Sequence, residues 1–200
     1  MLMTTSNEMT CMVQNYDLDG AVNALLNGGL VLYPTDTLWG IGCDATDPIA
    51  VENVYRLTRR DRSKPLIILV DSIAMLKQYV AHLHPRIETL LIHHVRPLTV
   101  VYDKAINLPS NLVGKDGSIA IRIVLDPYCK ALISAFGRPL VSTSANVSNA
   151  PFPTNFGSVS SEIIQGVDFV VKHRQNEKVN GEPSVIVKLS DKEELIFLRE

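Results

Sequence analysis

Residues 33–42 read YPTDTLWGIG, and they follow the apolar run LVL at 30–32. A short apolar run that is closed by a proline is typical of a buried strand, so we expect one over residues 30–34. Thr35, Asp36 and Thr37 come directly after it, and their side chains suit a turn because they hydrogen-bond to nearby backbone groups. GIGCDA at 40–45 predicts a second strand or a further turn. Taken by itself, this stretch favours a structural turn over a binding site.

Signals for helices and strands interleave along the rest of the chain. Asp47-Pro48 and Asp126-Pro127 each pair an N-cap acid with a proline at the first helical position, and Gly137 supplies a stop. The interleaving predicts an α/β fold with a twisted mixed sheet and flanking helices. We expect a single domain over residues 1–200, with a mobile N-terminal segment at 1–17. The predicted helices are 18–28, from 48 through 58, 72–80, 85–94, 127–137 and 156–165; the further strands are 65–70, 98–102, 118–124, 139–146, 167–171, 184–189 and 194–198.

The composition describes an ordinary globular chain of 200 residues with 46% hydrophobic and 20% charged residues. Its cysteines, Cys11, Cys43 and Cys129, form no CxxC pair, so we expect neither a disulfide framework nor a zinc site. Reduced thiols are typical of cytoplasmic proteins, which is where we expect the protein to work. The N-terminus lacks the basic start and apolar core of a signal peptide, and no apolar run reaches the roughly 20 residues of a membrane span.

The stretch RLTRRDRSKPL at 56–66 concentrates positive charge in a chain whose formal net charge is −2. It holds four arginines, one lysine and one aspartate. Cations at a helix end offset the helix dipole, which accounts for one or two of these charges. Arg62 and Lys64 lie past that end and run into a core strand, where guanidinium and ammonium groups suit phosphate. A solvated helix end and an anion site both fit.

Two later segments also carry polar groups in apolar surroundings. Arg122 lies inside the strand SIAIRI at 118–123, where it is either solvent-facing or paired with a carboxylate in a cavity, because an unpaired buried charge is costly. VSTSANVSNAPFPT at 141–154 gathers hydroxyl and amide groups after an apolar strand, as either ligand donors or a turn. The chain has no GxxxxGK[ST] or GxGxxG motif and no GxSxG elbow.

Together these segments resemble the YrdC/Sua5 family, in its short, single-domain threonylcarbamoyl-AMP synthase form. The resemblance runs in order from about Asp19 to Arg199. YPTDTLWGIG combined with STSAN is its most specific pair. The matching pieces are NGGLVLYPTDTLWGIGCDA, RRDRSKPLIIL, RPLTVVY, SIAIRI, RPLVSTSANVS, GEPSVIV and IFLRE.

The resemblance implies a fold with a concave, basic cavity and a nucleotidyltransferase that condenses ATP, L-threonine and bicarbonate to threonylcarbamoyl-AMP and pyrophosphate. Magnesium would arrive on the ATP phosphates, with no metal site of the protein's own and no covalent nucleophile. Arg60 and Lys64 would hold the phosphates, with an electrostatic role in catalysis. The other implied residues are Ser118, Ser144 and Arg199 for the nucleotide, Thr37, Arg122, Ser142 and Ser184 for threonine, and Thr35, Thr58 and Asn146 in the cavity lining.

The family also implies partners. A separate threonylcarbamoyl-transferase complex would move the group onto an adenosine of tRNA, and a direct contact with tRNA or double-stranded RNA is a further expectation. One departure keeps an alternative open: where the family's basic motif usually has a lysine, this chain has Thr58. Arg59 or Arg62 would then have to replace that charge. Otherwise the chain would be a YciO-like paralogue, or an RNA-binding module, with the same fold and little or no synthase activity.

Overall fold

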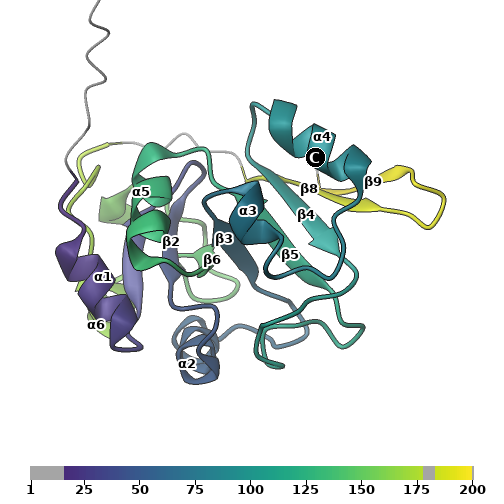
Figure 1. Ribbon diagram of the computed structural model, residues 1–200. Helices are drawn as coiled ribbons and strands as arrows, with labels where there is room; N and C mark the ends of the chain where they lie inside the picture. Colours follow the sequence, from purple (N-terminus) through teal and green to yellow (C-terminus); the bar gives the residue numbers. More distant parts are fainter. Residues whose placement is uncertain (1–15, 178–182, 200) are drawn as a thin grey trace, which may run out of the picture.

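The computed structural model describes residues 16–177 and 183–199 (Figure 1). Cys11 and most of the predicted mobile segment 1–17 therefore lie outside the described residues, whereas Tyr16 packs edge-on against Tyr128, with ring centroids 5.3 Å apart. The elements follow the order α1 (Asp19–Leu26), β1 (Val31–Pro34), β2 (Trp39–Gly42), α2 (Pro48–Thr58), β3 (Ile67–Val70), α3 (Ile73–Leu76), α4 (Pro85–His93), β4 (Leu98–Tyr102), β5 (Ile119–Ile123), α5 (Pro127–Phe136), β6 (Leu140–Ser144), η1 (Phe156–Ser158), α6 (Ser161–Gly166), β7 (Phe169–Val170), β8 (Val185–Leu189) and β9 (Leu195–Arg199).

The strands form one mixed, nine-stranded sheet in the order β7-β1-β2-β6-β3-β5-β4-β8-β9. Its centre pairs β3 with β5 in parallel and with β6 antiparallel, while β8 is parallel to β4. Figure 1 shows β8 and β9 extending as a hairpin at the end of the molecule opposite α1. The prediction of a mixed α/β sheet with flanking helices is confirmed.

The two faces of the sheet carry separate apolar cores. Strand alternation sends Leu32 and Ile68 into one core with residues of α2, α4 and α6. Tyr33 and Leu69, the neighbours of these residues, enter the other core with α1 and α5. Leu69 lies opposite Arg122 on β5, so Arg122 points to the α5 face of the sheet.

The two Asp-Pro pairs begin helices as their sequence predicts. Asp47 accepts hydrogen bonds from the backbone N–H groups of Ile49 and Ala50 at the start of α2. Asp126 accepts one from Cys129 at the start of α5, which Gly137 ends in the left-handed region at φ 76°. These caps place the starts of both helices at fixed points beside the sheet.

Three predicted elements differ most from those in the structure. The helix predicted over 72–80 is the four-residue α3, and the strand predicted over 167–171 pairs only at Phe169 and Val170. The helix predicted over 156–165 is divided into η1 and α6, because Ser160 is extended and its hydroxyl accepts a hydrogen bond from Ile163 as a new N-cap. Apolar content alone did not locate these local hydrogen bonds.

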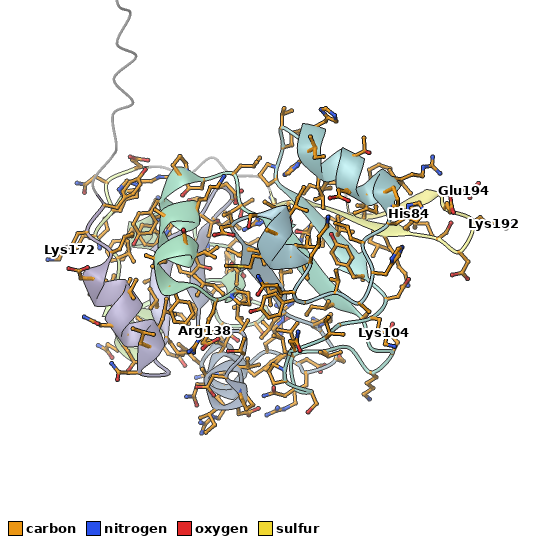
Figure 2. The ribbon with its side chains drawn as sticks, viewed as in Figure 1. His84, Lys104, Arg138, Lys172, Lys192 and Glu194 are labelled. Atoms are coloured by element: carbon orange, nitrogen blue, oxygen red, sulfur yellow. The ribbon has the colours of Figure 1, made fainter. Side chains whose placement is uncertain are left out.

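The turn and the second strand of the β8–β9 hairpin, residues 191–199, are exposed. Lys192 and Glu194 lie at its tip, with His84 nearby in Figure 2, and the His84 imidazole lies 3.4 Å from the Glu193 carboxylate. None of the helices in the described ranges combines the length and apolar character that a membrane crossing needs.

Candidate functional site

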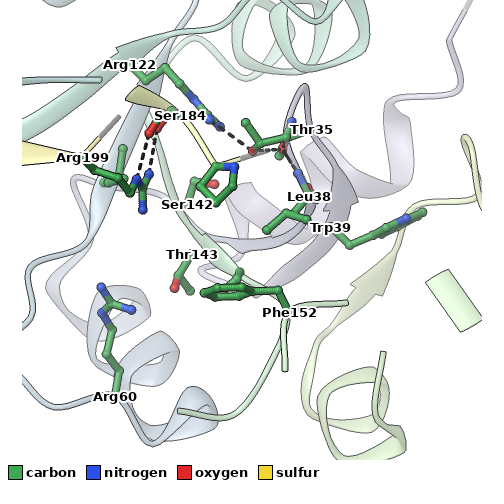
Figure 3. Close-up of a pocket in the computed structure, with 14 residues that line it drawn as sticks. Thr35, Leu38, Trp39, Arg60, Arg122, Ser142, Thr143, Phe152, Ser184 and Arg199 are labelled. Carbon is green, nitrogen blue, oxygen red and sulfur yellow. Dashed lines mark hydrogen bonds between the residues drawn. The ribbon is translucent and has the colours of Figure 1, made fainter. Parts of the chain in front are cut away.

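Two adjoining cavities open beside β2, β3 and β6. The first has a volume of about 230 Å³, and its lining comes from the loop after β1, from β5 and β6, and from the chain around β8 and β9. The second has a volume of about 470 Å³ and lies between the end of α2 and the loop after β6. Arg60, Thr143, Ser144 and Phe152 line both, so the two cavities adjoin and together form one depression. Figure 3 shows residues that line the first cavity, these four among them.

The loop Thr35–Leu38 forms one wall of the first cavity. The Thr35 hydroxyl donates to the Leu38 carbonyl at 2.7 Å and accepts from the backbone N–H groups of Thr37 and Leu38 at 3.1 Å. It also lies 3.0 Å from the Thr37 hydroxyl. Thr35 therefore fixes the turn, as the sequence suggested, and the fixed turn presents the buried Thr37 hydroxyl to the cavity.

Arg122 projects from β5 toward this loop and is 5% exposed. Its Nη1 donates to the Thr37 hydroxyl at 3.2 Å, as Figure 3 shows. Its Nη2 lies 3.3 Å from the Asp36 carboxylate. Of the two alternatives that the sequence left open for Arg122, the structure supports the buried arginine that faces a carboxylate.

A second arginine closes the opposite side of the first cavity. Arg199 on β9 donates from Nε to the Ser184 carbonyl at 2.9 Å and from Nη2 to the Ser184 hydroxyl at 3.1 Å. That hydroxyl lies 2.8 Å from the hydroxyl of Thr99 on β4. Burial, and then the like charge of Arg122, lower the pKa of Arg199 below its ordinary value. The two guanidinium groups are therefore held near each other despite their repulsion.

Arg60 and Lys64 supply the positive charge of the second cavity. Arg60 follows α2, and its side chain donates to the backbone carbonyls of Lys64 and Pro65, so its charge has no carboxylate partner in these contacts. Burial lowers the pKa of Arg60 from its ordinary value. Lys64 lines only the second cavity. An anion lying across both cavities would contact Arg60 at their shared boundary.

Thr58 stands where the family usually has a lysine, and the structure shows whether Arg59 or Arg62 supplies the missing charge. Thr58 lines the second cavity but is 2% exposed, and its hydroxyl donates to the Val54 carbonyl within α2. Arg59 pairs with Glu162, and Arg62 pairs with Glu52, on the outside of the helix end. Neither arginine is among the described lining residues of the two cavities, so neither places a charge at the Thr58 position.

Strand β6 brings the serine-rich segment into the same site. Ser142 lines the first cavity and Ser144 lines both. Asn146 lies in the second, where its Nδ2 donates to the carbonyls of Val147 and Ala150. Its buried Oδ1 has no hydrogen-bond partner among the described residues. The described residues therefore leave this acceptor unused.

Ser118 is the predicted site residue that the structure leaves apart. It precedes β5, its hydroxyl donates to Asp116 at 2.6 Å, and it is not among the described lining residues of either cavity. Its proposed contact with the nucleotide stays a prediction.

Among the residues that the sequence reasoning did not assign to the site, Phe152 and Asp36 matter most for its chemistry. Phe152 is 57% exposed and borders both cavities, and its position between Pro151 and Pro153 was a signal for an exposed loop aromatic. Asp36 was treated only as a turn residue, because nothing in the sequence shows that the loop meets Arg122.

The charges in this depression define the chemistry it suits. Within the described chain, no Asp or Glu lines either cavity, whereas the cationic side chains of Arg60, Lys64, Arg122 and Arg199 do. Guanidinium forks bind carboxylates and phosphates in two-point contacts, and the threonine and serine hydroxyls add neutral donors. The site therefore suits a ligand with more than one anionic group. The described residues also bring together no group of three or more His, Cys, Asp or Glu side chains that could hold a metal ion.

A mixed nine-stranded sheet with an arginine- and hydroxyl-lined depression defines a known class of protein. A family model for Sua5/YciO/YrdC proteins, described as "Telomere recombination", matches residues 23–200, and the chain belongs to this family.

Individual relatives are similar over most of the chain. A protein of Xanthomonas euvesicatoria named threonylcarbamoyl-AMP synthase is 33% identical over 163 residues, which are 80% of this chain and 87% of that protein. The structure of P. abyssi Sua5 complexed with L-threonine matches with a TM-score of 0.82 at 27% identity, over 90% of this chain. This chain covers only 52% of that Sua5 chain, about half its length. E. coli YciO shares the fold, with a TM-score of 0.79 at 22% identity over 92% of this chain and 88% of YciO.

Proposed function

We propose that the protein is an L-threonylcarbamoyladenylate synthase, an enzyme that condenses ATP, L-threonine and bicarbonate to threonylcarbamoyl-AMP and pyrophosphate. One observation carries the proposal: Arg122, Thr37 and Ser184 gather around a small cavity that adjoins a second, cationic one. The first suits an amino acid, whose carboxylate needs a buried cation, and the second suits a chain of phosphates. The names of the Xanthomonas relatives and the L-threonine in the Sua5 complex support the same assignment.

The reaction has two steps with the same electrostatic need. The threonine amine adds to bicarbonate carbon, water leaves, and a carbamate forms. A carbamate oxygen then attacks the α-phosphorus of ATP, the bond to the β-phosphate oxygen breaks, and pyrophosphate leaves. Both steps bring anions together, so the protein must position them and offset their repulsion.

Each group of residues has a part in that positioning. Arg122 would bind the threonine carboxylate, with the hydroxyls of Thr37, Ser142 and Ser184 around it. Arg60 and Lys64 would bind the phosphates, and Ser144 and Arg199 would complete the nucleotide contacts. Thr35 would hold the wall, and Asn146 would line the phosphate side. No covalent nucleophile is required.

Magnesium belongs to the substrate in this proposal. The polar side chains that line the two cavities are cations, hydroxyls and, in the second cavity, amides, with no carboxylate among the described residues. Magnesium prefers carboxylate, phosphate and water oxygens. The ion would therefore be held by the phosphates of ATP.

Cys43 and Cys129 are free thiols, as is usual in the cytoplasm. We expect the protein to work there, and tRNA and a threonylcarbamoyl-transferase complex would take up its product.

A second candidate rests on Thr58. Because Thr58 supplies no charge and Arg59 and Arg62 point elsewhere, the phosphate side has fewer cations than the resemblance implies. A YciO-like paralogue, or an RNA-binding module that uses the same basic depression without catalysis, would fit that deficit. Salt-sensitive RNA binding that ATP and threonine fail to displace would favour this candidate.

The direct test is turnover. Purified protein is incubated with magnesium ATP, bicarbonate and L-threonine, and pyrophosphate release is measured against reactions with L-serine or no amino acid. We expect release that depends on L-threonine and on bicarbonate. Equal release with L-serine, or without any amino acid, contradicts the proposal.

A further inference from the structure

We propose that Asp36 is a positioning residue, which holds the Arg122 guanidinium from behind so that the guanidinium meets the substrate carboxylate in the first cavity. The inference rests on the proposed function and concerns how that site recognises its amino acid. It starts from the burial of the pair: the Arg122 and Asp36 side chains are 5% and 10% exposed. A buried cation without a countercharge is strongly unfavourable, and Asp36 is the carboxylate that faces it.

Asp36 acts from outside the cavity. Thr35 and Thr37 line the first cavity, but Asp36, which lies between them in the sequence, does not. Its Oδ2 lies 3.5 Å from the backbone nitrogen of Leu125, which donates to it just before α5 begins. Asp36 thus lies between the Arg122 guanidinium and the start of α5. A ligand in the cavity would approach Arg122 from the other side.

The contacts of Arg122 leave some of its guanidinium donors without a hydrogen-bond partner among the described residues. Asp36 faces Nη2 and Thr37 accepts from Nη1, while Nε is buried and has no hydrogen-bond partner among the described residues. The Thr37 hydroxyl accepts a hydrogen bond, and the Asp36 carboxylate makes an ion pair without a hydrogen bond, so both constrain the guanidinium without using all of its donors. A substrate carboxylate can then bind an arginine whose orientation is already set, which lowers the cost of ordering it.

The positive charge of Arg199 is the reason that Arg122 needs the Asp36 carboxylate. Its pKa is lowered by burial and by the charge of Arg122, so the two guanidinium groups repel each other across the cavity. Arg199 is held by Ser184, and Arg122 is held by Asp36. Without the Asp36 charge, repulsion would favour rotamers of Arg122 that turn away from the position where the substrate carboxylate binds.

The experiment measures binding of L-threonine, of L-threonine amide and of magnesium ATP to the full chain by calorimetry. Asp36→Asn keeps the shape of the side chain and removes its charge. We expect L-threonine to bind on the order of tenfold more weakly, the amide to be unchanged, and ATP to be unchanged. The matched control is Asp103→Asn, which removes the carboxylate of an exposed pair with Lys188 and leaves all three affinities unchanged.

A double-mutant cycle tests whether Asp36 works through Arg122. In an Arg122→Gln background, Asp36→Asn should cause no further loss of L-threonine affinity, which a general structural role would not predict. Wild-type-like or tighter L-threonine binding by Asp36→Asn, or a full additional loss in the Arg122→Gln background, overturns the inference. Wild-type protein that fails to prefer L-threonine over its amide overturns the proposed function instead, and the inference with it.

Discussion

Arg60 lies where the two cavities meet, and this position distinguishes it from the other cations. Arg199 and Arg122 line only the first cavity, and Lys64 lines only the second. A nucleotide that extends from one cavity into the other would therefore pass Arg60 whatever its orientation. The side chain is already fixed by the carbonyls of Lys64 and Pro65, so little ordering is needed when a phosphate binds.

Replacing these cations should weaken the use of ATP. We expect Arg60→Ala to raise the KM for ATP by about 10- to 100-fold, the range for losing a charged hydrogen bond, and Lys64→Ala to have a smaller effect. Steady-state pyrophosphate release at varied ATP measures both. Arg86→Ala is the control, because Arg86 lies on α4 and contacts the Glu193 carbonyl. Normal turnover by both cavity variants would remove the phosphate role.

Thr58 gives a prediction of the opposite sign. Thr58→Lys places an ammonium group at the wall of the second cavity, and we expect activity to be kept or raised, with a KM for ATP that is several-fold lower. Thr58→Met, which fills similar space without charge, should show no such gain. If both variants lose ATP affinity equally, the size of the side chain at position 58 determines the effect, and the positive charge of the lysine does not.

At the scale of elements, the same Asp-Pro signal has two structural contexts. Asp47 only caps α2, and its carboxylate accepts from Ile49 and Ala50. Asp126 caps α5 and also pairs with Arg174 at 2.7 Å. The same Arg174 nitrogen lies 3.5 Å from the Thr35 carbonyl. The start of α5 is thereby linked to the loop that forms the cavity wall.

These two caps should therefore respond differently to removal. We expect Asp47→Ala to cost about 1 kcal/mol of unfolding free energy, as for an ordinary N-cap. Asp126→Ala should cost about 3 kcal/mol, because it also removes the buried carboxylate that pairs with Arg174 and leaves that arginine only the exposed Glu177, and it should weaken L-threonine binding. Urea unfolding and calorimetry measure the two effects. Equal losses in both variants, with unchanged threonine binding, would show that the link to Thr35 has no consequence.

How far the sequence predicts the structure depends on whether a signal is local. The caps at Asp47 and Asp126 and the strand that precedes Thr35 were predictable, because neighbouring residues determine them. The break at Ser160 was not, since apolar content masks a single hydroxyl. The pairing of Asp36 with Arg122 depends on strand β5 lying beside the loop between β1 and β2. No local sequence pattern predicts that contact.

At the scale of the whole molecule, buried phenols link stability to pH. Burial is the main cause that raises the pKa values of Tyr33, Tyr102 and Tyr128 far above their ordinary value of 10.0. Burial likewise raises the pKa values of the Cys43 and Cys129 thiols above 9.0. In the unfolded chain these groups lose their protons at the ordinary values, while the folded chain keeps them. Their contribution to stability is complete below about pH 9 and is lost as the pH rises above that value.

We therefore expect the unfolding free energy to fall between about pH 9 and pH 11, by up to about 1.4 kcal/mol per pH unit for each such group. Urea unfolding at several pH values measures it. Tyr102→Phe is a matched variant, because the Tyr102 hydroxyl is buried without a hydrogen-bond partner among the described residues. It should unfold like wild type at pH 7 and lose less stability at pH 10.5. If the unfolding free energy of Tyr102→Phe falls with pH as steeply as that of the wild type, the Tyr102 phenol does not contribute to the pH dependence.

The depression also joins chain segments that are far apart in sequence, from Thr35 after β1 to Arg199 on β9. Synthesis proceeds from the N-terminus, and domains fold as their segments become available. A nascent chain that has not yet released β9 lacks the guanidinium that closes the cavity against Ser184. The growing polypeptide on the ribosome would therefore not yet have a complete ligand site, and ligand could not stabilise partly made chains.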